Sequence, residues 1–92
     1  MIRSFAHKGL QKFYETGSTA GINTQHSTRI GRILTLLNVA KSVQEMDVPG
    51  WFLHPLKGNL AGHWSVRVSG AWRVTFKMED GDAEVVDYQQ YH

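Results

Sequence analysis

The stretch His63–Lys77, with the sequence HWSVRVSGAWRVTFK, decides the fold. Apolar and polar residues alternate in His63–Val68 and again in Ala71–Lys77, which is the pattern of β-strands with one buried face. We expect a hairpin in which a three-residue loop with a bulge pairs Val68 with Trp72 and keeps the tryptophans on one face. The expected apolar face holds Trp64, Val66, Val68, Trp72, Val74 and Phe76, and the expected polar face holds Ser65, Arg67, Arg73, Thr75 and Lys77.

The first half of the chain shows the period of helices instead. Apolar residues spaced i, i+3 and i+4 predict a helix at His7–Thr16, which ends at Gly17. A second helix, capped by Asn23 or Thr24, is expected to run to about Lys41. Its buried stripe holds Ile30, Ile33, Leu34 and Leu37, while Leu36 and Val39 fall outside that stripe.

Further strand patterns flank the hairpin. Trp51–His54 precedes it, Ala83–Tyr88 follows a turn at residues 79–82, and Ile2–Phe5 is a candidate N-terminal strand. The sequence therefore predicts an α+β fold, with an N-terminal strand and a helical hairpin packed on one face of a small, mainly antiparallel β-sheet. A length of 92 residues corresponds to one domain, which we expect to span residues 1–92.

The composition is that of an ordinary small globular domain, with 41% hydrophobic and 20% charged residues. The chain has no cysteine, so a disulfide or a thiolate metal site is excluded. His7, His26 and His63 show no spacing typical of metal ligands, and we expect neither a metal nor another cofactor. No apolar run approaches a membrane span, and the N-terminus lacks the apolar core of a signal peptide. The expected location is the cytoplasm, away from any membrane.

The net charge of +2 is distributed unevenly. Residues 1–41 contain six basic residues and one acidic residue, whereas residues 42–92 contain four basic and seven acidic residues. A basic helical half suits a polyanion such as nucleic acid, or an acidic protein. For any single cation, solvation of a helix face is the simpler explanation. The helical cations that we consider for RNA contacts are Lys8, Lys12, Arg29 and Arg32.

The segment Leu53–Gly58, with the sequence LHPLKG, places two titratable side chains on a stiff loop. Pro55 fixes its own φ and favours extended backbone at His54, so His54 should lie at a strand end, with Lys57 projecting from the loop. A half-buried histidine bonded to a backbone carbonyl is an equal alternative for His54, and simple solvation is one for Lys57. The polar face of the sheet adds Arg67, Arg73 and Lys77 to these two residues, although Arg73 could equally pair with Glu84 or Asp87 across the strands.

This set of side chains has the groups that RNA cleavage without a metal requires. One group must activate the 2′-OH, one must neutralise charge on the scissile phosphate, and one must protonate the leaving 5′-oxygen. His54, His92, Lys57 and Arg73 together can provide all three functions, and Tyr88 or Tyr91 could stack a base. The residues alone leave the assignment of these roles open.

The chain resembles the HigB-type toxins of the RelE superfamily of bacterial toxin–antitoxin systems. The resemblance covers essentially the whole chain, and the order and spacing of its motifs are specific although each motif is weak alone. The motifs are Ile2-x-Ser4-Phe5-x-His7-Lys8-Gly9-Leu10, Leu53-His54-Pro55-Leu56-Lys57-Gly58, Gly62-x-Trp64-Ser65-Val66, Trp72-Arg73-Val74-x-Phe76, Gly81-Asp82-Ala83 and Tyr91-His92.

The resemblance implies a microbial RNase fold and a ribosome-dependent endoribonuclease that cleaves mRNA in the A site without a metal. It implies as partners the 70S ribosome with its 16S rRNA, the mRNA, and a cognate helix-turn-helix antitoxin of the HigA type, through which the toxin meets operator DNA. The active-site set of the family falls on His54, Lys57, Arg73, Tyr91 and His92, and RNA contacts are expected from Arg67, Lys77 and the four helical cations.

Two points stay open at this stage. The family often has an aspartate where this chain has Gln90, so Asp87 or the α-carboxylate would have to orient His92. ParE-type toxins of the same superfamily inhibit DNA gyrase and cleave nothing, and an RNA-binding module without turnover is a further alternative. The imidazole-rich rim of His54 and His92 argues for the nuclease.

Overall fold

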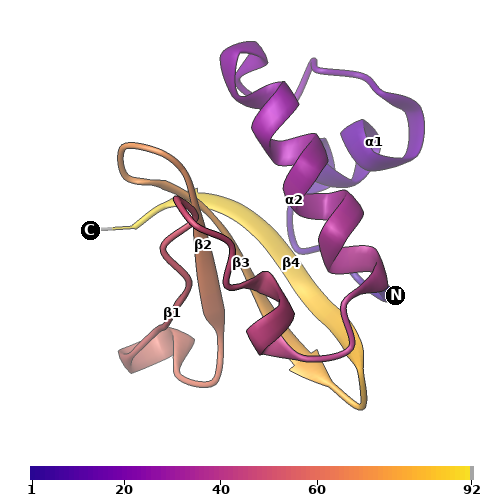
Figure 1. The fold of residues 1–92 in the computed structure, drawn as a ribbon. Helices are drawn as coiled ribbons and strands as arrows, with labels where there is room; N and C mark the ends of the chain where they lie inside the picture. Colours follow the sequence, from indigo (N-terminus) through magenta and orange to yellow (C-terminus); the bar gives the residue numbers. More distant parts are fainter. Residues whose placement is uncertain (92) are drawn as a thin grey trace.

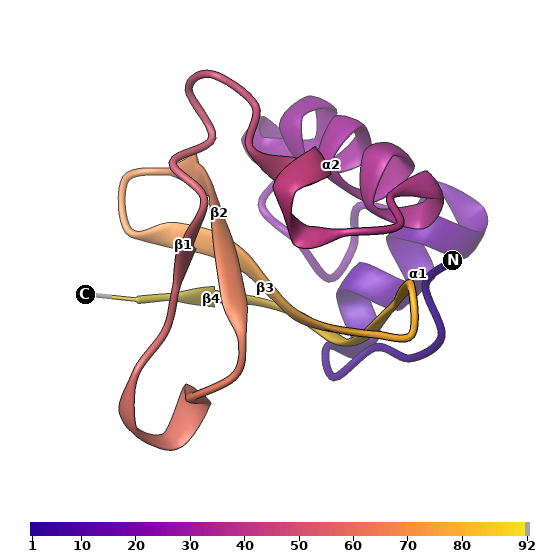
Figure 2. The same cartoon turned by 60° about the horizontal axis from the view of Figure 1, so that its bottom comes forward.

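The computed structural model describes residues 1–91, in which two helices are followed by a four-stranded sheet. The elements are α1 (Lys8–Thr16), α2 (Ser27–Val39), β1 (His54–Pro55), β2 (Trp64–Ser69), β3 (Trp72–Glu79) and β4 (Asp82–Gln90), with 3-10 turns η1 (Thr24–His26), η2 (Val43–Met46) and η3 (Gly58–Leu60) between them. The strands lie in the order β1-β2-β3-β4, and every neighbouring pair is antiparallel. Both helices lie on one side of the sheet (Figure 1, Figure 2), so the predicted α+β architecture is confirmed.

Side-chain and backbone caps define α1 where the sequence predicts a helix. The Nδ1 atom of His7 accepts a hydrogen bond from the Leu10 N–H at 2.9 Å and caps the first turn. Gly17 ends the helix in the left-handed region at φ +80°, and its N–H donates to the Phe13 carbonyl at 2.8 Å. Leu10 is the one fully buried side chain of α1, so this helix rests on the core through a narrow contact.

The helix α2 supplies most of the helical side of the core. Its buried residues are the predicted ones, and Val39 is 61% exposed, outside the stripe as expected. Asn23 caps the short turn η1 rather than α2, which begins only at Ser27 and ends at Val39, two residues before the predicted end. No helix within residues 1–91 is long and apolar enough to cross a membrane. The α2 stripe holds Ile30, Ile33, Leu34 and Leu37, which belong to one core with Val66, Val74, Phe76 and Val86 of the sheet.

β2 and β3 form the predicted hairpin with a different register at its tip. Ser69, and not Val68, lies opposite Trp72, so the connection has two residues. Gly70, at φ +58°, allows this tighter turn. The bulge falls at Val68, which becomes the extra residue of β2. The predicted bulge is therefore confirmed, while the predicted Val68–Trp72 pair is wrong by one residue.

The edges of the sheet differ most from the prediction. Phe52 has φ +50°, which interrupts extended backbone, so the expected strand at Trp51–His54 is wrong except for His54, which forms the two-residue β1 with Pro55. The segment Ile2–Phe5 makes two isolated parallel bridges to β4 rather than a strand. A bulge at Val85, with φ +46°, lies between these bridges, and its N–H donates to the Ser4 hydroxyl instead of a backbone carbonyl.

Candidate active site on the polar face of the sheet

Strand pairing places His54, Arg67 and Arg73, three of the predicted site residues, on the face of the sheet that the helices leave uncovered. Side chains of residues that lie opposite each other on neighbouring antiparallel strands share a face. The pairs build two adjacent rows across the sheet. The first row runs from His54 through Ser65 and Thr75 to Asp87, and the second from Arg67 through Arg73 to Gln89.

The buried hydroxyl groups of Ser65 and Thr75 lie beneath these cations. The hydroxyl-bearing side chains of Ser65 and Thr75 are fully buried although they belong to the polar face. Arg73 donates from its terminal Nη1 to the Ser65 Oγ at 3.3 Å, and Gln89 donates from Nε2 to the Thr75 Oγ1 at 2.9 Å. Hydrogen bonds to buried groups restrict the rotamers of the side chains above them. The hydrogen bond to Ser65 therefore holds the Arg73 guanidinium in place.

Arg73 is the cation at the centre of this face. Its side chain is half-buried, and its Nε–H is buried without an acceptor among residues 1–91. Burial lowers the pKa of Arg73 below its ordinary value, the neighbouring charge of Arg67 lowers the pKa further, and the phenol of Tyr91 opposes both effects. A guanidinium held in one position is suited to bind a phosphate oxygen.

His54 and Lys57 border the same face from β1 and the loop that follows it. The Nδ1 atom of His54 lies 3.1 Å from the carbonyl oxygen of Phe52. Because a carbonyl only accepts, Nδ1 carries the hydrogen, which leaves Nε2 as the nitrogen able to take or give a proton at the site. Lys57 precedes η3, its side chain is exposed, and within residues 1–91 its ammonium forms no ion pair.

The C-terminal tail is tied to the hairpin beside Arg73. β4 continues to Gln90, two residues beyond the predicted end at Tyr88, and Gln90 lies opposite Trp72. The Tyr91 N–H then donates to the Ala71 carbonyl at 2.8 Å. Tyr91 is thus held near the start of β3, whereas Tyr88 is buried in the core and is not available to stack a base. The predicted catalytic residue His92 lies outside the described residues.

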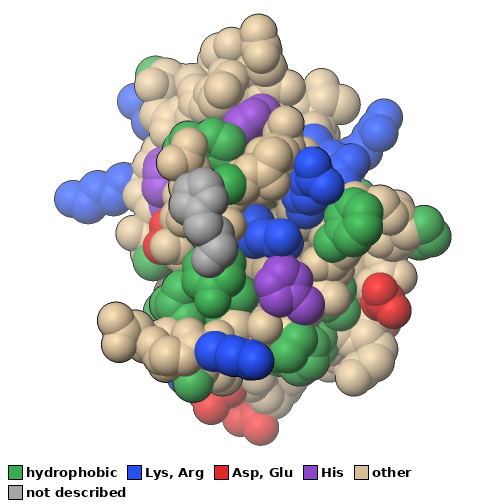
Figure 3. All heavy atoms as spheres, turned by 90° about the vertical axis from the view of Figure 1, so that its left-hand side faces the viewer, with side chains coloured by type: hydrophobic (Ala, Val, Ile, Leu, Met, Phe, Trp, Pro, Cys, Tyr) green, Lys and Arg blue, Asp and Glu red, His purple; other side chains and the backbone are tan. Residues whose placement is uncertain are grey.

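The surface view shows how charge is distributed around this site. Figure 3 looks at the side of the molecule that carries β1 and the C-terminal end of β4, and lysine, arginine and histidine side chains gather near the middle of that side. Acidic side chains lie mostly toward its rim. Such a surface attracts anions and favours a phosphate backbone over a cationic partner.

The residues expected to contact RNA are divided between the two sides of the sheet. Arg67 and Lys77 are half-buried on the polar face, where Lys77 lies opposite Glu84. Arg29 donates to the Arg67 carbonyl at 3.3 Å and to the Gly50 carbonyl at 2.5 Å and so ties α2 to β2, while its expected RNA contact stays a prediction. Lys8, Lys12 and Arg32 are exposed on the helices, and their expected RNA contacts stay a prediction.

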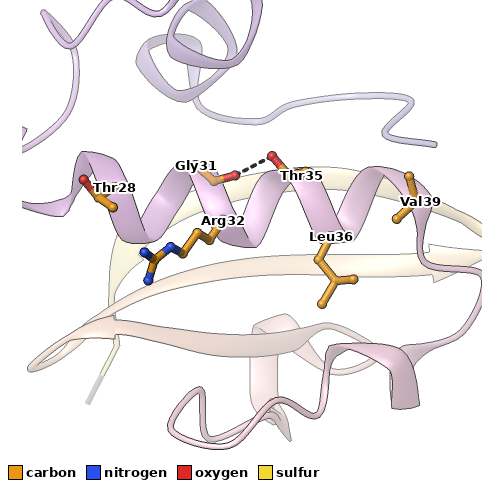
Figure 4. A pocket seen from close by; sticks show the side chains of 6 residues that line it. All are labelled: Thr28, Gly31, Arg32, Thr35, Leu36 and Val39. Carbon is orange, nitrogen blue, oxygen red and sulfur yellow. Dashed lines mark hydrogen bonds between the residues drawn. The ribbon is translucent and has the colours of Figure 1, made fainter.

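Arg32 belongs to a different surface from the site. It lines a shallow groove along an outward side of α2, which the labelled side chains of Figure 4 outline. That side of the helix is mainly apolar, because Leu36 is half-buried and Val39 is exposed. This groove contains none of the predicted catalytic residues. Its lining residues are Thr28, Gly31, Arg32, Thr35, Leu36 and Val39.

The sequence patterns do not predict several features of the site. Ser65 and Thr75 were expected on the polar face, but alternation alone does not indicate that they are buried there. The interaction of Gln89 with Thr75 depends on the register of β4, which a bulge shifts. Phe52, whose carbonyl orients His54, has no sequence signal for its positive φ. Within residues 1–91, no three histidine, aspartate or glutamate side chains are grouped so that they could hold a metal ion.

Comparisons with known proteins agree with this architecture. A model of the family described as "RelE-like toxin of type II toxin-antitoxin system HigB" matches residues 3–92. The chain is 41% identical over 92 residues to "Endoribonuclease HigB" of Proteus vulgaris, which covers 100% of both chains. It is 32% identical over 85 residues to "Toxin HigB-1" of Vibrio cholerae serotype O1, which covers 90% of each.

The solved structures that resemble the chain show the same fold at low identity. The crystal structure of YafQ from E. coli superposes with a TM-score of 0.55 over 98% of this chain and 93% of YafQ, at 12% identity. A mutant of YafQ gives the same TM-score at 15% identity. Together with the family match over almost the whole length, these comparisons establish that the chain belongs to the HigB-like toxins, which are RelE-like toxins of type II toxin–antitoxin systems.

Proposed function

We propose that this chain is an endoribonuclease that blocks translation by cleaving mRNA in the ribosomal A site. The relative of 41% identity is named an endoribonuclease, and the match covers both chains completely. The observation that carries the proposal is the geometry of Arg73, whose half-buried side chain is held by Ser65 and lies opposite Arg67 on the polar face. A ribosomal site of action places the protein in the cytoplasm.

The chemistry follows from the groups around Arg73. The guanidinium binds the scissile phosphate and stabilises the negative charge that develops on it as the 2′-oxygen attacks. Lys57 adds a second cation from the loop, and the Nε2 of His54 takes or gives a proton. The family pattern assigns Tyr91 and His92 to the same site, with one imidazole as base and the other as acid. No step in this scheme needs a metal.

The partners follow from the same family. A type II toxin implies a cognate antitoxin. We propose that this antitoxin is a helix-turn-helix protein of the HigA type, and that the toxin reaches operator DNA only through it. The proposed substrate complex is the 70S ribosome, where the basic surface of the toxin contacts 16S rRNA and mRNA phosphates, with Arg67 and Lys77 closest to the site.

The test compares codon-phased mRNA cleavage by wild type, Arg73→Ala and His54→Ala, mapped by primer extension on a reporter mRNA. Removing a preorganised cation from a developing negative charge costs about 10²-fold to 10³-fold in rate, and we expect a loss of that size for Arg73→Ala. Lys41→Ala, an exposed cation outside the site, is the matched control and should cleave like wild type.

The controls and the contradicting outcomes are as follows. Circular dichroism and thermal unfolding of the variants confirm that the fold persists. Undiminished cleavage by Arg73→Ala would contradict the proposed site. Growth arrest with DNA damage and intact mRNA in the wild type would instead indicate the ParE-like mode of gyrase inhibition, and the proposed nuclease would be wrong.

A further inference from the structure

The ring of Phe52 is held in solvent by a backbone that this residue type rarely adopts. Phe52 is 60% exposed and has φ +50°, a left-handed conformation that is uncommon for a bulky aromatic residue. Its neighbour Trp51 is buried, and the Trp51 carbonyl accepts a 2.7 Å hydrogen bond from the Arg67 N–H. The loop is therefore anchored at Trp51 and turned sharply at Phe52. Strained residues of this kind gather at functional sites, where the surrounding structure holds them.

Phe52 also belongs to the site by its contacts. The guanidinium carbon of Arg67 lies 5.5 Å from the centroid of the Phe52 ring, a cation–π arrangement. The carbonyl of Phe52 accepts the Nδ1–H of His54. One residue thus links a proposed catalytic imidazole to a cation on the polar face. Arg67 contacts one face of the ring, and Phe52 is still 60% exposed.

We infer that Phe52 is a stacking platform for a nucleobase of the mRNA next to the scissile phosphate, a role that rests on the proposed nuclease function. Nucleobases stack on open aromatic faces, and single-stranded RNA is commonly held in this way. Arg67, beneath the ring, supports the stack and lies in the row of Arg73, which the proposed function assigns to the phosphate. The base of a nucleotide would then stack on Phe52, while the neighbouring phosphate contacts Arg73.

The surroundings favour RNA over a protein as the occupant of this ring. Arg67, Arg73 and His54 lie on the same face and Lys57 follows in the bordering loop, which suits a polyanion whose bases alternate with phosphates. A plainer role, in which Phe52 only shields the Arg67 side chain, would affect stability without affecting RNA. The two roles can be separated with glycine at this position. Glycine adopts a positive φ without strain, and it removes the ring at the same time.

The experiment uses three substitutions at Phe52 and one matched control. Phe52→Trp keeps an aromatic face, Phe52→Leu keeps an apolar side chain without one, and Phe52→Gly removes the ring but suits φ +50°. Val85→Gly is the control, because Val85 is also exposed with a positive φ of 46° but lies in the β4 bulge beside Ser4. Single-turnover cleavage on programmed ribosomes gives the maximal rate and the half-saturating toxin concentration of each variant.

We expect the half-saturating concentration to rise roughly 5- to 150-fold for Phe52→Leu and Phe52→Gly, and to stay near the wild-type value for Phe52→Trp and Val85→Gly. The maximal rate should change far less. Phe52→Gly should unfold at a temperature equal to or above that of wild type, so that its weaker binding is not a consequence of instability. An mRNA with 2-aminopurine in the A-site codon should be quenched by wild type and Phe52→Trp but not by Phe52→Leu.

Two outcomes would overturn the inference. Wild-type binding and quenching by Phe52→Leu would show that no base rests on the ring. Wild-type cleavage by Phe52→Leu together with weakened binding of the antitoxin would show that the ring contacts a protein. In both cases cleavage by the wild type, and its loss in Arg73→Ala, would leave the proposed nuclease intact, whereas a wild type that cleaves nothing would contradict the proposed function itself.

Discussion

The two faces of the sheet are stabilised in different ways, and Thr75 and Phe76 show the difference on adjacent positions of β3. Both side chains are fully buried. Phe76 joins the apolar core, where its ring volume is what matters. Thr75 lies on the opposite face and accepts a hydrogen bond from Gln89 beneath the site cations. The apolar face therefore holds the fold together, while the polar face positions charged groups on top of it.

The strongest test of this contrast is Phe76→Ala. We expect the free energy of unfolding to fall by about 3–5 kcal/mol, because truncating a fully buried phenylalanine removes apolar burial and leaves a cavity. Urea unfolding followed by tryptophan fluorescence measures the change. Phe76→Leu, which keeps most of the volume, should cost less. A loss below about 1 kcal/mol for Phe76→Ala would mean that the apolar face is loosely packed and the contrast is false.

A smaller effect is expected for Thr75→Val on the opposite face. The two side chains have nearly the same shape, so the change removes mainly the acceptor of the Gln89 hydrogen bond, worth about 0.5–1.5 kcal/mol. The same unfolding assay applies. In a Gln89→Ala background the substitution should cost clearly less, and a double-mutant cycle measures the difference. Equal costs in both backgrounds would show that the hydrogen bond does not stabilise this face.

The same contrast separates what the sequence predicts from what it does not. The alternation of His63–Lys77 indicates both faces correctly, because the period of side chains along a strand is a local property. Pairing through the hairpins then brings Arg67 and Arg73 together, since consecutive strands are neighbours. His54, however, was expected to end a strand and instead begins β1, so that the loop follows Pro55.

The remaining features depend on contacts between distant segments. The two bulges at Val68 and Val85 set the register of every residue beyond them, and no residue pattern marks their exact position. The turn at Phe52 depends on the anchoring of Trp51 by β2. In the sequence Arg29 is indistinguishable from a surface cation, because its two backbone acceptors lie in distant segments. Local patterns therefore predict the faces, and tertiary contacts decide the details of the site.

The smallest effect is expected at Asp82, where polar contacts lie at the exposed start of β4. Its carboxylate accepts hydrogen bonds from the Met1 ammonium at 2.8 Å and the Arg3 Nε–H at 2.6 Å, and these bonds lower the pKa of Asp82 from 3.8 to about 2. A lowered pKa in the folded state means that the carboxylate contributes stability above pH 3.8 and loses it as the pH falls toward about 2.

Asp82→Asn should therefore lower the unfolding temperature slightly near neutral pH, and the difference from wild type should vanish as the pH falls from 3.8 to about 2. Salt should reduce the difference as well, because the Met1 ammonium and the Arg3 guanidinium are exposed. Thermal unfolding of both proteins across this pH range measures it. A difference that persists at the acidic end would mean that Asp82 acts through shape rather than charge. A loss larger than that of Thr75→Val would contradict the view that buried polar contacts, rather than exposed ion pairs, stabilise the polar side of this sheet.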